Sequence, residues 1–265
     1  MASTAAIVVE VENILGPLAK FKARSHETSK TQHIQLLSSS NENSPTVVLL
    51  GDSMLERMIT TGQSPSLTVP WPSEIMLSST ALATLALDRL KGVLNVGVGG
   101  DKIQNIAYRL VGDADPDPSK TLSGLAAALA AHNSVKLWVV QAGTNNLSPK
   151  MGLTDADCKA MGVLLRGLLR LSSPQPESKV LLTGLFPRTD ISVNLVDIAN
   201  QKLAAMAREV NLEIGKESIF FLPPTKGVET QKHLEDHVHL NLHGYTIWVE
   251  ELLPAVAGLL EKIVE

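Results

Sequence analysis

The chain has 265 residues, and 44% of them are hydrophobic, which is enough to fill a sizeable core in one large domain or two small ones. The 23 basic and 27 acidic residues give a formal net charge of −4, and only 3% of the residues are aromatic, so charge and stacking capacity both argue against a nucleic-acid partner. The single cysteine, Cys158, excludes an internal disulfide and a zinc ribbon. We expect a soluble globular protein stabilised by the burial of apolar side chains.

The first residues of the chain differ from a secretory signal. No basic stretch precedes the apolar residues, and Glu10, Glu12 and Asn13 interrupt the apolar run. No run in the sequence approaches the roughly 18 apolar residues that a membrane-spanning helix needs. We therefore expect no membrane span and a cytoplasmic location, which also suits a lone thiol.

The first 45 residues are predicted to form an N-terminal extension ahead of a main domain at 46–265. Residues 5–22 have the apolar spacing of one amphipathic helix, which would dock either on the main domain or on a partner. Residues 25–45 are rich in Ser, Thr, Asn, Gln, Lys and His, and this composition is typical of a linker.

Short apolar runs alternate with longer helical patterns after residue 45. The predicted strands are 46–50, 93–96, 135–141, 179–183 and 218–222. The predicted helices are about 74–90, 102–111, 119–132, 155–171, 193–210 and 243–263. This alternation indicates right-handed βαβ units, and so an α/β protein: a three-layer α/β/α sandwich around a five-stranded parallel sheet. Catalytic groups in such a fold lie at the carboxyl ends of the strands.

Polar clusters follow the first three predicted strands directly. They are Gly51 to Ser53, residues 97–101 and residues 143–146. A short polar side chain beside exposed backbone amides is what a nucleophile with an oxyanion hole requires. Each cluster also has a simpler interpretation: the first as a helix cap, the third as a turn. The glycine-rich second cluster matches neither a P-loop nor the GxGxxG spacing, so a nucleotide site is the weaker alternative.

A fourth cluster favours catalysis over those interpretations. Asp236 precedes His239 by three residues, so its carboxylate can accept the Nδ1–H of the imidazole while Nε2 faces a serine. His237 is adjacent to Asp236 and is expected to point elsewhere. We expect His233 and His237 to be exposed loop residues.

The four histidines at 233, 237, 239 and 243 also raise the possibility of a metal site. Pairs of them have the i, i+4 spacing of helical metal ligands. The HExxH order is absent, however, and the segment has the pattern of a loop or an extended chain. We therefore predict that the site holds no metal.

These four blocks resemble, in order and spacing, those of the SGNH or GDSL hydrolases. The matching residues are 50–54, 95–101, 143–146 and 236–240. Within that superfamily the chain looks most like the intracellular platelet-activating-factor acetylhydrolase catalytic-subunit branch, to which residues 185–188 also point. The resemblance covers residues 46 to about 263, so the main domain is identified as an SGNH hydrolase domain.

The resemblance implies a flavodoxin-like sheet of order 2-1-3-4-5 and an esterase that needs no cofactor. Ser53 would be the nucleophile, His239 the general base and Asp236 its orienting acid. The oxyanion donors would be the backbone amides of Ser53 and Gly100 and the side-chain amide of Asn145. The substrate would be a small or short-chain acyl ester, cleaved through an acyl-enzyme intermediate.

Two alternatives to a serine esterase stay open. An acyltransferase would use the same triad with an alcohol or amine in place of water. A non-catalytic binding or scaffold protein would keep the fold and engage a partner through its N-terminal helix, although retention of all five site residues speaks against it. The expected partners are a small-molecule ester and, as an oligomeric state to consider, a second copy in a homodimer.

Several other residues have expected supporting roles. Asp52 and Asp101 are predicted to hydrogen-bond loop amides and hold the site rigid. Arg188 would either meet an anionic substrate group or form a structural ion pair. The three tryptophans, at 71, 138 and 248, are predicted to pack in the core or against loops. The connection at 60–73 is longer than is usual for the family.

Overall fold

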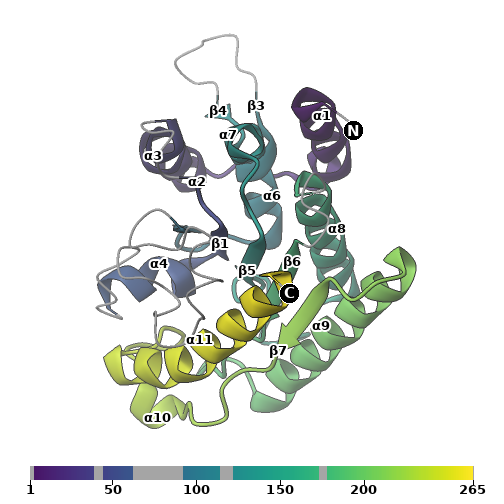
Figure 1. Ribbon diagram of the computed structural model, residues 1–265. Coiled ribbons are helices and arrows are strands. Elements are labelled where there is room, and N and C mark those ends of the chain that lie inside the picture. Colours follow the sequence, from purple (N-terminus) through teal and green to yellow (C-terminus); the bar gives the residue numbers. More distant parts are fainter. Residues whose placement is uncertain (1–2, 39–43, 62–91, 114–121, 173–177, 265) are drawn as a thin grey trace.

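The computed structural model describes residues 3–38, 44–61, 92–113, 122–172 and 178–264 (Figure 1). Its main sheet has five strands in the order β2-β1-β5-β6-β7. The strands are β1 (Val47–Gly51), β2 (Val93–Gly97), β5 (Leu137–Gln141), β6 (Lys179–Thr183) and β7 (Ile219–Leu222). All neighbouring strands in this sheet pair in parallel. The predicted strands and the flavodoxin-like order 2-1-3-4-5 are confirmed.

Helices cover both faces of the sheet, because every strand carries apolar side chains on both sides. In β1, Val48 and Leu50 face one core, whereas Val47 and Leu49 face the other. On the first face lie α6 (Ile103–Val111), α7 (Leu125–His132), α8 (Asp155–Leu171) and α9 (Val193–Ile214). On the second face lie α4 (Ser53–Thr60) and α11 (Leu242–Val264) (Figure 1). These three layers form the expected sandwich.

The helix boundaries follow local capping signals. Thr154 and Asp157 form a reciprocal capping box, and α8 has the predicted bounds of 155–171. Helix α9 continues to Ile214, four residues past the prediction, and ends at Gly215 in the left-handed conformation. The predicted helix at 74–90 and the long connection at 60–73 fall mostly outside the described residues, and so does Trp71.

The expectation of one helix over residues 5–22 was wrong. Helix α1 (Thr4–Leu15) ends before Gly16 and Pro17, and a 3-10 turn, η1 (Gly16–Leu18), follows it. Proline has no N–H for a helix interior, so the pair stops the helix. Ile7, Val11 and Leu15 are buried in the first core, and α1 therefore docks on the main domain.

The expectation of a linker from residue 25 was also wrong for the part that the structure describes. This part forms α2 (Ala23–Thr28), a π-helical turn η2 (Ser29–His33) and α3 (Ile34–Ser38). Ser25, Ser29 and His33 are buried, and Leu37 reaches the first core. Burial lowers the pKa of His33 to about 3, so its ring is neutral. A domain boundary near residue 45 stays a prediction.

Three further short elements complete the described chain. Strands β3 (Gly112–Asp113) and β4 (Leu122–Ser123) pair in antiparallel, and α10 (Thr230–His233) precedes the loop that carries Asp236.

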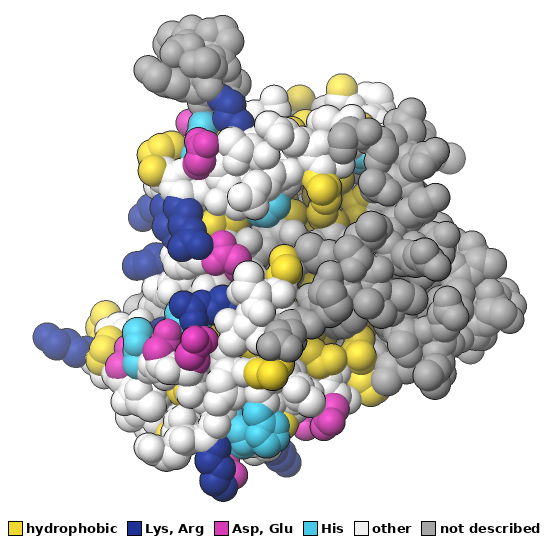
Figure 2. All heavy atoms as spheres, turned by 90° about the vertical axis from the view of Figure 1, so that its left-hand side faces the viewer, with side chains coloured by type: hydrophobic (Ala, Val, Ile, Leu, Met, Phe, Trp, Pro, Cys, Tyr) yellow, Lys and Arg dark blue, Asp and Glu magenta, His cyan; other side chains and the backbone are white. Residues whose placement is uncertain are grey.

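None of the described helices is long and apolar enough to cross a membrane. On the described part of the face shown in Figure 2, basic and acidic side chains are intermingled.

Candidate active site

The loops that follow β1, β2 and β5 meet at one edge of the sheet, because β1 lies between the other two strands. The Val98 amide donates to the Gly51 carbonyl at 3.1 Å, and the Asp52 amide donates to the Gln141 carbonyl at 3.2 Å. The three polar clusters predicted at strand ends are therefore neighbours in space. In open parallel sheets this edge is where ligands bind.

Ser53 is the first residue of α4, and Asp52 alone separates it from the end of β1. Asp52 caps this helix, and its Oδ1 accepts a hydrogen bond from the Met54 amide at 2.9 Å. The Tyr245 hydroxyl of α11 donates to the Met54 carbonyl at 2.9 Å and so fixes the turn from the other side. Ser53 thus lies at the positive end of a helix dipole, with 6% of its surface exposed.

Burial raises the pKa of the Asp52 carboxyl to about 7, although the hydrogen bond from the Met54 amide opposes the shift. The side chain is fully buried. Asp52 therefore accepts from an amide in the first turn of α4 rather than from a loop amide, and it takes up a proton near neutral pH.

Ser53, His239 and Asp236 form a continuous chain of hydrogen bonds. The Ser53 hydroxyl lies 2.9 Å from His239 Nε2, and His239 Nδ1 lies 2.7 Å from Asp236 Oδ2. Because the carboxylate accepts from Nδ1–H, Nε2 of the neutral ring is left to accept the serine proton. The structure thus brings these three predicted residues together in the order that nucleophilic catalysis needs.

The Asp236 carboxylate is held by its own loop. Its Oδ1 accepts from the amides of Val238 and His239, each at 2.8 Å. Burial raises the pKa of Asp236, but the hydrogen bonds from the His239 ring and the two amides outweigh it and hold the pKa below its usual range. Arg57 Nη1 adds a cation 3.8 Å from Oδ2. Asp236 is therefore ionised at neutral pH.

Gly100 and Asn145 lie on loops that contact each other. Gly100 has a φ of +75°, a conformation that suits glycine. Its amide donates to no acceptor among the described residues. Asn145 Nδ2 donates one hydrogen to the Asp101 carbonyl at 3.0 Å, which leaves its second amide hydrogen for a ligand.

Asp101 differs from the prediction, because it binds side chains rather than loop amides. The carboxylate is fully buried and accepts from Arg109 Nε at 2.7 Å. Arg109 also donates to the Val96 carbonyl at 2.8 Å and the Gly51 carbonyl at 3.0 Å. A buried arginine therefore joins the carboxyl ends of β1 and β2 directly, through hydrogen bonds to their carbonyls, while it also binds Asp101.

The sequence gives little sign of this network. Arg109 stands among the buried apolar residues of α6, and a charge on such a face is the one local signal. Ser25 and Lys22, which also bind Asp101, come from the segment predicted to be an extension and linker. Ser25 lies 76 positions and Lys22 79 positions from Asp101 in the sequence, so their role depends on long-range contacts.

The predictions for the two remaining loop histidines had opposite outcomes. His233 is buried, contrary to prediction, because its Nδ1 accepts from the Glu229 amide at 2.8 Å and its ring packs edge-on against His243. His237 is exposed, as predicted.

Arg188 forms a structural ion pair, with two contacts to Asp190 of 2.7 and 2.8 Å. Trp138 and Trp248 are fully buried, as expected. No group of three potential metal ligands occurs among the described side chains.

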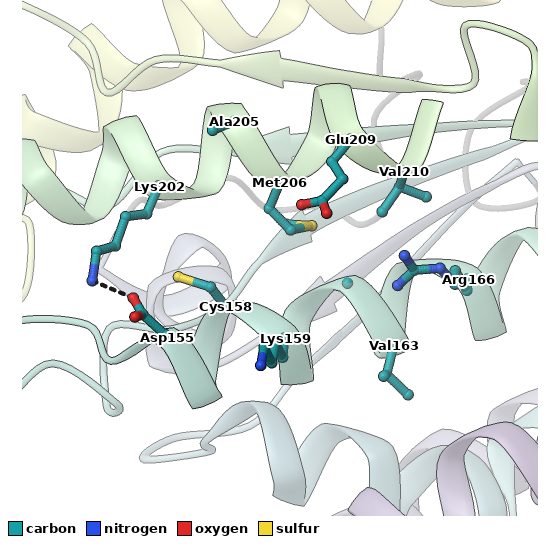
Figure 3. Close-up of a pocket in the computed structure, with 11 residues that line it drawn as sticks. Asp155, Cys158, Lys159, Val163, Arg166, Lys202, Ala205, Met206, Glu209 and Val210 are labelled. Carbon is teal, nitrogen blue, oxygen red and sulfur yellow. Dashed lines mark hydrogen bonds and ion pairs between the residues drawn. The ribbon is translucent and has the colours of Figure 1, made fainter. Parts of the chain in front are cut away.

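A groove of about 520 Å³ lies elsewhere on the molecule, between α8 and α9 (Figure 3). An ion pair of 2.7 Å between Lys202 and Asp155 closes one end of it. Cys158 lines the groove, and burial raises the pKa of its thiol, so the thiol is a weak nucleophile at neutral pH. The groove contains none of the predicted site residues.

No protein-family model and no curated protein matches the chain. Solved structures do match it. A mutant acetyl esterase with acetate has a TM-score of 0.52 and 14% identity, over 83% of this chain and 99% of that one. A candidate acylhydrolase from Bacteroides fragilis has a TM-score of 0.50 and 18% identity, over 88% and 96% of the two chains. A family two carbohydrate esterase from Clostridium thermocellum, in complex with cellohexaose, has a TM-score of 0.50 and 12% identity, over 81% and 64%.

The chain has the SGNH hydrolase fold. Identities of 12% to 18% show a shared fold and leave the chemistry to be argued from the site.

Proposed function

We propose that the protein is a carboxylic-ester hydrolase of the SGNH/GDSL superfamily with Ser53 as its nucleophile. The hydrogen-bonded chain from Asp236 through His239 to Ser53 carries this proposal. The acylhydrolase and esterases that share the fold support the reaction class. The Gly100 amide, which donates to no acceptor among the described residues, and the second Asn145 amide hydrogen lie on the adjoining loops, as an oxyanion hole requires.

The reaction follows from this geometry. Ser53 Oγ attacks the ester carbonyl carbon while its proton passes to His239 Nε2, and the Asp236 carboxylate stabilises the imidazolium that forms. The carbonyl oxygen becomes an oxyanion, which accepts hydrogen bonds from the amides of Ser53 and Gly100 and from Asn145.

The second half of the reaction reverses these proton movements. The imidazolium of His239 gives its proton to the departing alcohol oxygen, which leaves the acyl group bound to Ser53 Oγ. Water then attacks the acyl carbonyl as His239 takes a proton from it, and the acid leaves as the serine hydroxyl is restored. An acyltransferase would differ only in the nucleophile of this half.

We propose small or short-chain acyl groups as substrates. An acetyl esterase is among the structures that share the fold, and the sequence blocks resemble the platelet-activating-factor acetylhydrolase catalytic-subunit branch.

Hydrolysis of p-nitrophenyl esters from acetyl to palmitoyl tests the proposal. We expect turnover by the wild type with an optimum at short chains, and a kcat lower by about 10⁴-fold to 10⁶-fold in Ser53→Ala. Ser192→Ala is the matched control, since Ser192 is exposed and its side chain makes no capping hydrogen bond to α9. A folded wild type without activity on any ester, or full activity in Ser53→Ala, would contradict the proposal.

A further inference from the structure

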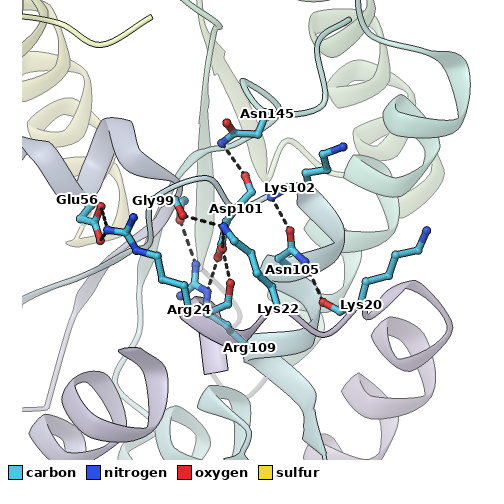
Figure 4. A network of polar contacts seen from close by, with 12 residues as sticks. Lys20, Lys22, Arg24, Glu56, Gly99, Asp101, Lys102, Asn105, Arg109 and Asn145 are labelled. Carbon is cyan, nitrogen blue, oxygen red and sulfur yellow. Dashed lines mark hydrogen bonds and ion pairs between the residues drawn. The ribbon is translucent and has the colours of Figure 1, made fainter. Parts of the chain in front are cut away.

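A basic segment at residues 20–24, which contains Lys20, Lys22 and Arg24, lies against the loop that carries Gly100 (Figure 4). The Lys22 ammonium donates to the Gly99 carbonyl at 2.7 Å and to Asp101 Oδ1 at 3.3 Å. The Lys22 side chain is 29% exposed, so it is partly withdrawn from water. These contacts join residues that are 77 and 79 positions apart in the sequence.

The contact with Gly99 acts on the proposed oxyanion donor through one covalent unit. The carbonyl of Gly99 and the N–H of Gly100 belong to the same peptide group, which is planar and, in its usual trans form, points them in opposite directions. A hydrogen bond that fixes the carbonyl therefore also fixes the direction of the N–H. Gly100 has a positive φ and, as glycine, would otherwise move easily between backbone conformations.

The same contact changes the charge distribution of that peptide. An ammonium hydrogen bond withdraws electron density from the Gly99 carbonyl, and such polarisation strengthens the hydrogen bond that the Gly100 N–H can donate. The Asp101 carboxylate is already paired with the buried Arg109 guanidinium at 2.7 Å. Lys22 therefore brings a net positive charge to the loop, which favours a developing anion.

Neighbouring contacts hold Lys22 in this place. The Lys20 amide donates to the Gln104 carbonyl at 3.0 Å, and Asn105 Nδ2 donates to the Lys20 carbonyl at 2.9 Å. Two residues beyond Lys22, Arg24 Nη2 lies 2.9 Å from both carboxylate oxygens of Glu56 on α4. The segment is thus fastened on both sides of Lys22.

The two glycines of the loop are closely covered by these cations. A Cβ atom on Gly99 would lie 2.7 Å from Arg24 Nη1, and one on Gly100 would lie 2.9 Å from Lys22 Nζ. Side chains at these positions would displace the cations. The glycines therefore allow the basic segment to approach the loop backbone.

We propose that Lys22 is a positioning residue for ester hydrolysis, which orients and polarises the Gly99–Gly100 peptide so that the Gly100 amide meets the oxyanion. This inference rests on the proposed function. Because the oxyanion exists only after attack on the carbonyl, loss of Lys22 lowers kcat and leaves substrate binding largely unchanged.

Three variants test the role of Lys22. Lys22→Met removes the charge and both hydrogen bonds, and Lys22→Arg keeps the charge and the donors. Lys20→Met is the control, because Lys20 is exposed and binds its neighbours through its backbone (Figure 4). We would measure kcat and KM on a short p-nitrophenyl ester, with active sites counted by fluorophosphonate titration so that unfolded protein does not lower the apparent kcat.

We expect Lys22→Met to lower kcat about 10-fold to 100-fold, somewhat less than removal of an oxyanion donor itself, with KM within about twofold of the wild type. Lys22→Arg should recover most of the loss, and Lys20→Met should match the wild type. A wild-type kcat per active site in Lys22→Met, a change confined to KM, or no recovery in Lys22→Arg would overturn the role of Lys22 and leave the esterase proposal standing. An inactive wild type would overturn both.

Discussion

Asp236 and His239 lie three residues apart on one loop, whereas the loop that carries Gly100 is held by Arg109 from the next helix and by Lys22 and Ser25 from a distant part of the chain. The loop from Asp236 to His239 forms its hydrogen bonds locally, and spacing alone predicts that pairing. The contacts of Lys22 and Ser25 with the loop that carries Gly100 require the N-terminal segment to pack against α6. A locally encoded Asp–His pair can therefore lie beside a proposed oxyanion loop that depends on long-range packing.

The two halves also differ in how their carboxylates are stabilised. The Asp236 side chain is 37% exposed, and two backbone amides and one ring N–H satisfy it. Asp101 is fully buried and is balanced by a buried guanidinium. Water can replace a hydrogen-bond partner that the exposed Asp236 loses. No water reaches the buried Asp101 to replace a lost partner.

The largest expected effect is on the triad. His239→Ala should lower kcat by about 10⁴-fold or more, because no other described group reaches Ser53 Oγ to take its proton, and should change stability little. His237→Ala is the control, since its ring is exposed two residues away. Steady-state kinetics and urea unfolding of both variants check this. Equal activities of the two variants would contradict the assignment of the base.

Loss of the buried cation should act on stability. Arg109→Met leaves Asp101 buried with Lys22 as its one remaining cation among the described residues, and we expect the free energy of unfolding to fall by about 3 to 5 kcal/mol. Arg24→Met breaks the exposed ion pair with Glu56 and should lower the free energy of unfolding by about 1 kcal/mol or less. Urea unfolding measures both. Similar losses in the two variants would show that the buried network is no more demanding than a surface pair.

Asn145→Ala should lower kcat by roughly 10²-fold, about 3 kcal/mol in the barrier, with little change in KM. The interpretation of Asn145 as a turn residue gives a different outcome, in which stability falls but each active site keeps a normal kcat. The thermal midpoint, measured beside kcat per titrated active site, separates the two. A near-normal kcat would remove Asn145 from the oxyanion hole.

The smallest expected effect is a pH dependence from Asp52. The folded protein holds a proton on this carboxyl up to a pKa of about 7, whereas the unfolded chain loses it near pH 4. The stabilising contribution of this proton is therefore complete below about pH 4 and is lost as pH rises through about 7.

Asp52→Asn removes this titration, while its Oδ1 can still accept from the Met54 amide. We expect the stability of the variant, relative to the wild type, to increase as pH rises from about 4 to 7. Urea unfolding at pH 5 and pH 8 checks this. A constant difference between the two proteins would show that Asp52 is ionised throughout.

The sheet was predictable because buried parallel strands are continuous apolar runs, and β1 and β6 match their predicted ranges to within one residue. Helix α8 was predictable because Thr154 and Asp157 cap it locally. The segment from residue 25 was not, because its polar residues are buried by contacts with distant groups such as Asp101. His233 was missed for a similar reason, since its burial follows from packing against α11.

The same distinction applies to the candidate site. The place of Ser53 after a strand and the pairing of Asp236 with His239 follow from strand ends and local spacing, whereas the role of Ser53 as nucleophile came from the resemblance to the SGNH hydrolases. The contribution of Lys22 and Arg109 follows from the folded arrangement of α2 and α6 around the loop after β2. No local sequence pattern encodes such an arrangement.

Reaction of the folded protein with a fluorophosphonate, followed by peptide mass spectrometry, tests the central claim most directly, because this reagent modifies a serine that a neighbouring base has activated. We expect one adduct per chain, on Ser53, with none in Ser53→Ala and much slower reaction in His239→Ala. Absence of an adduct on the folded wild type, or an adduct that persists in Ser53→Ala, would contradict Ser53 as the nucleophile.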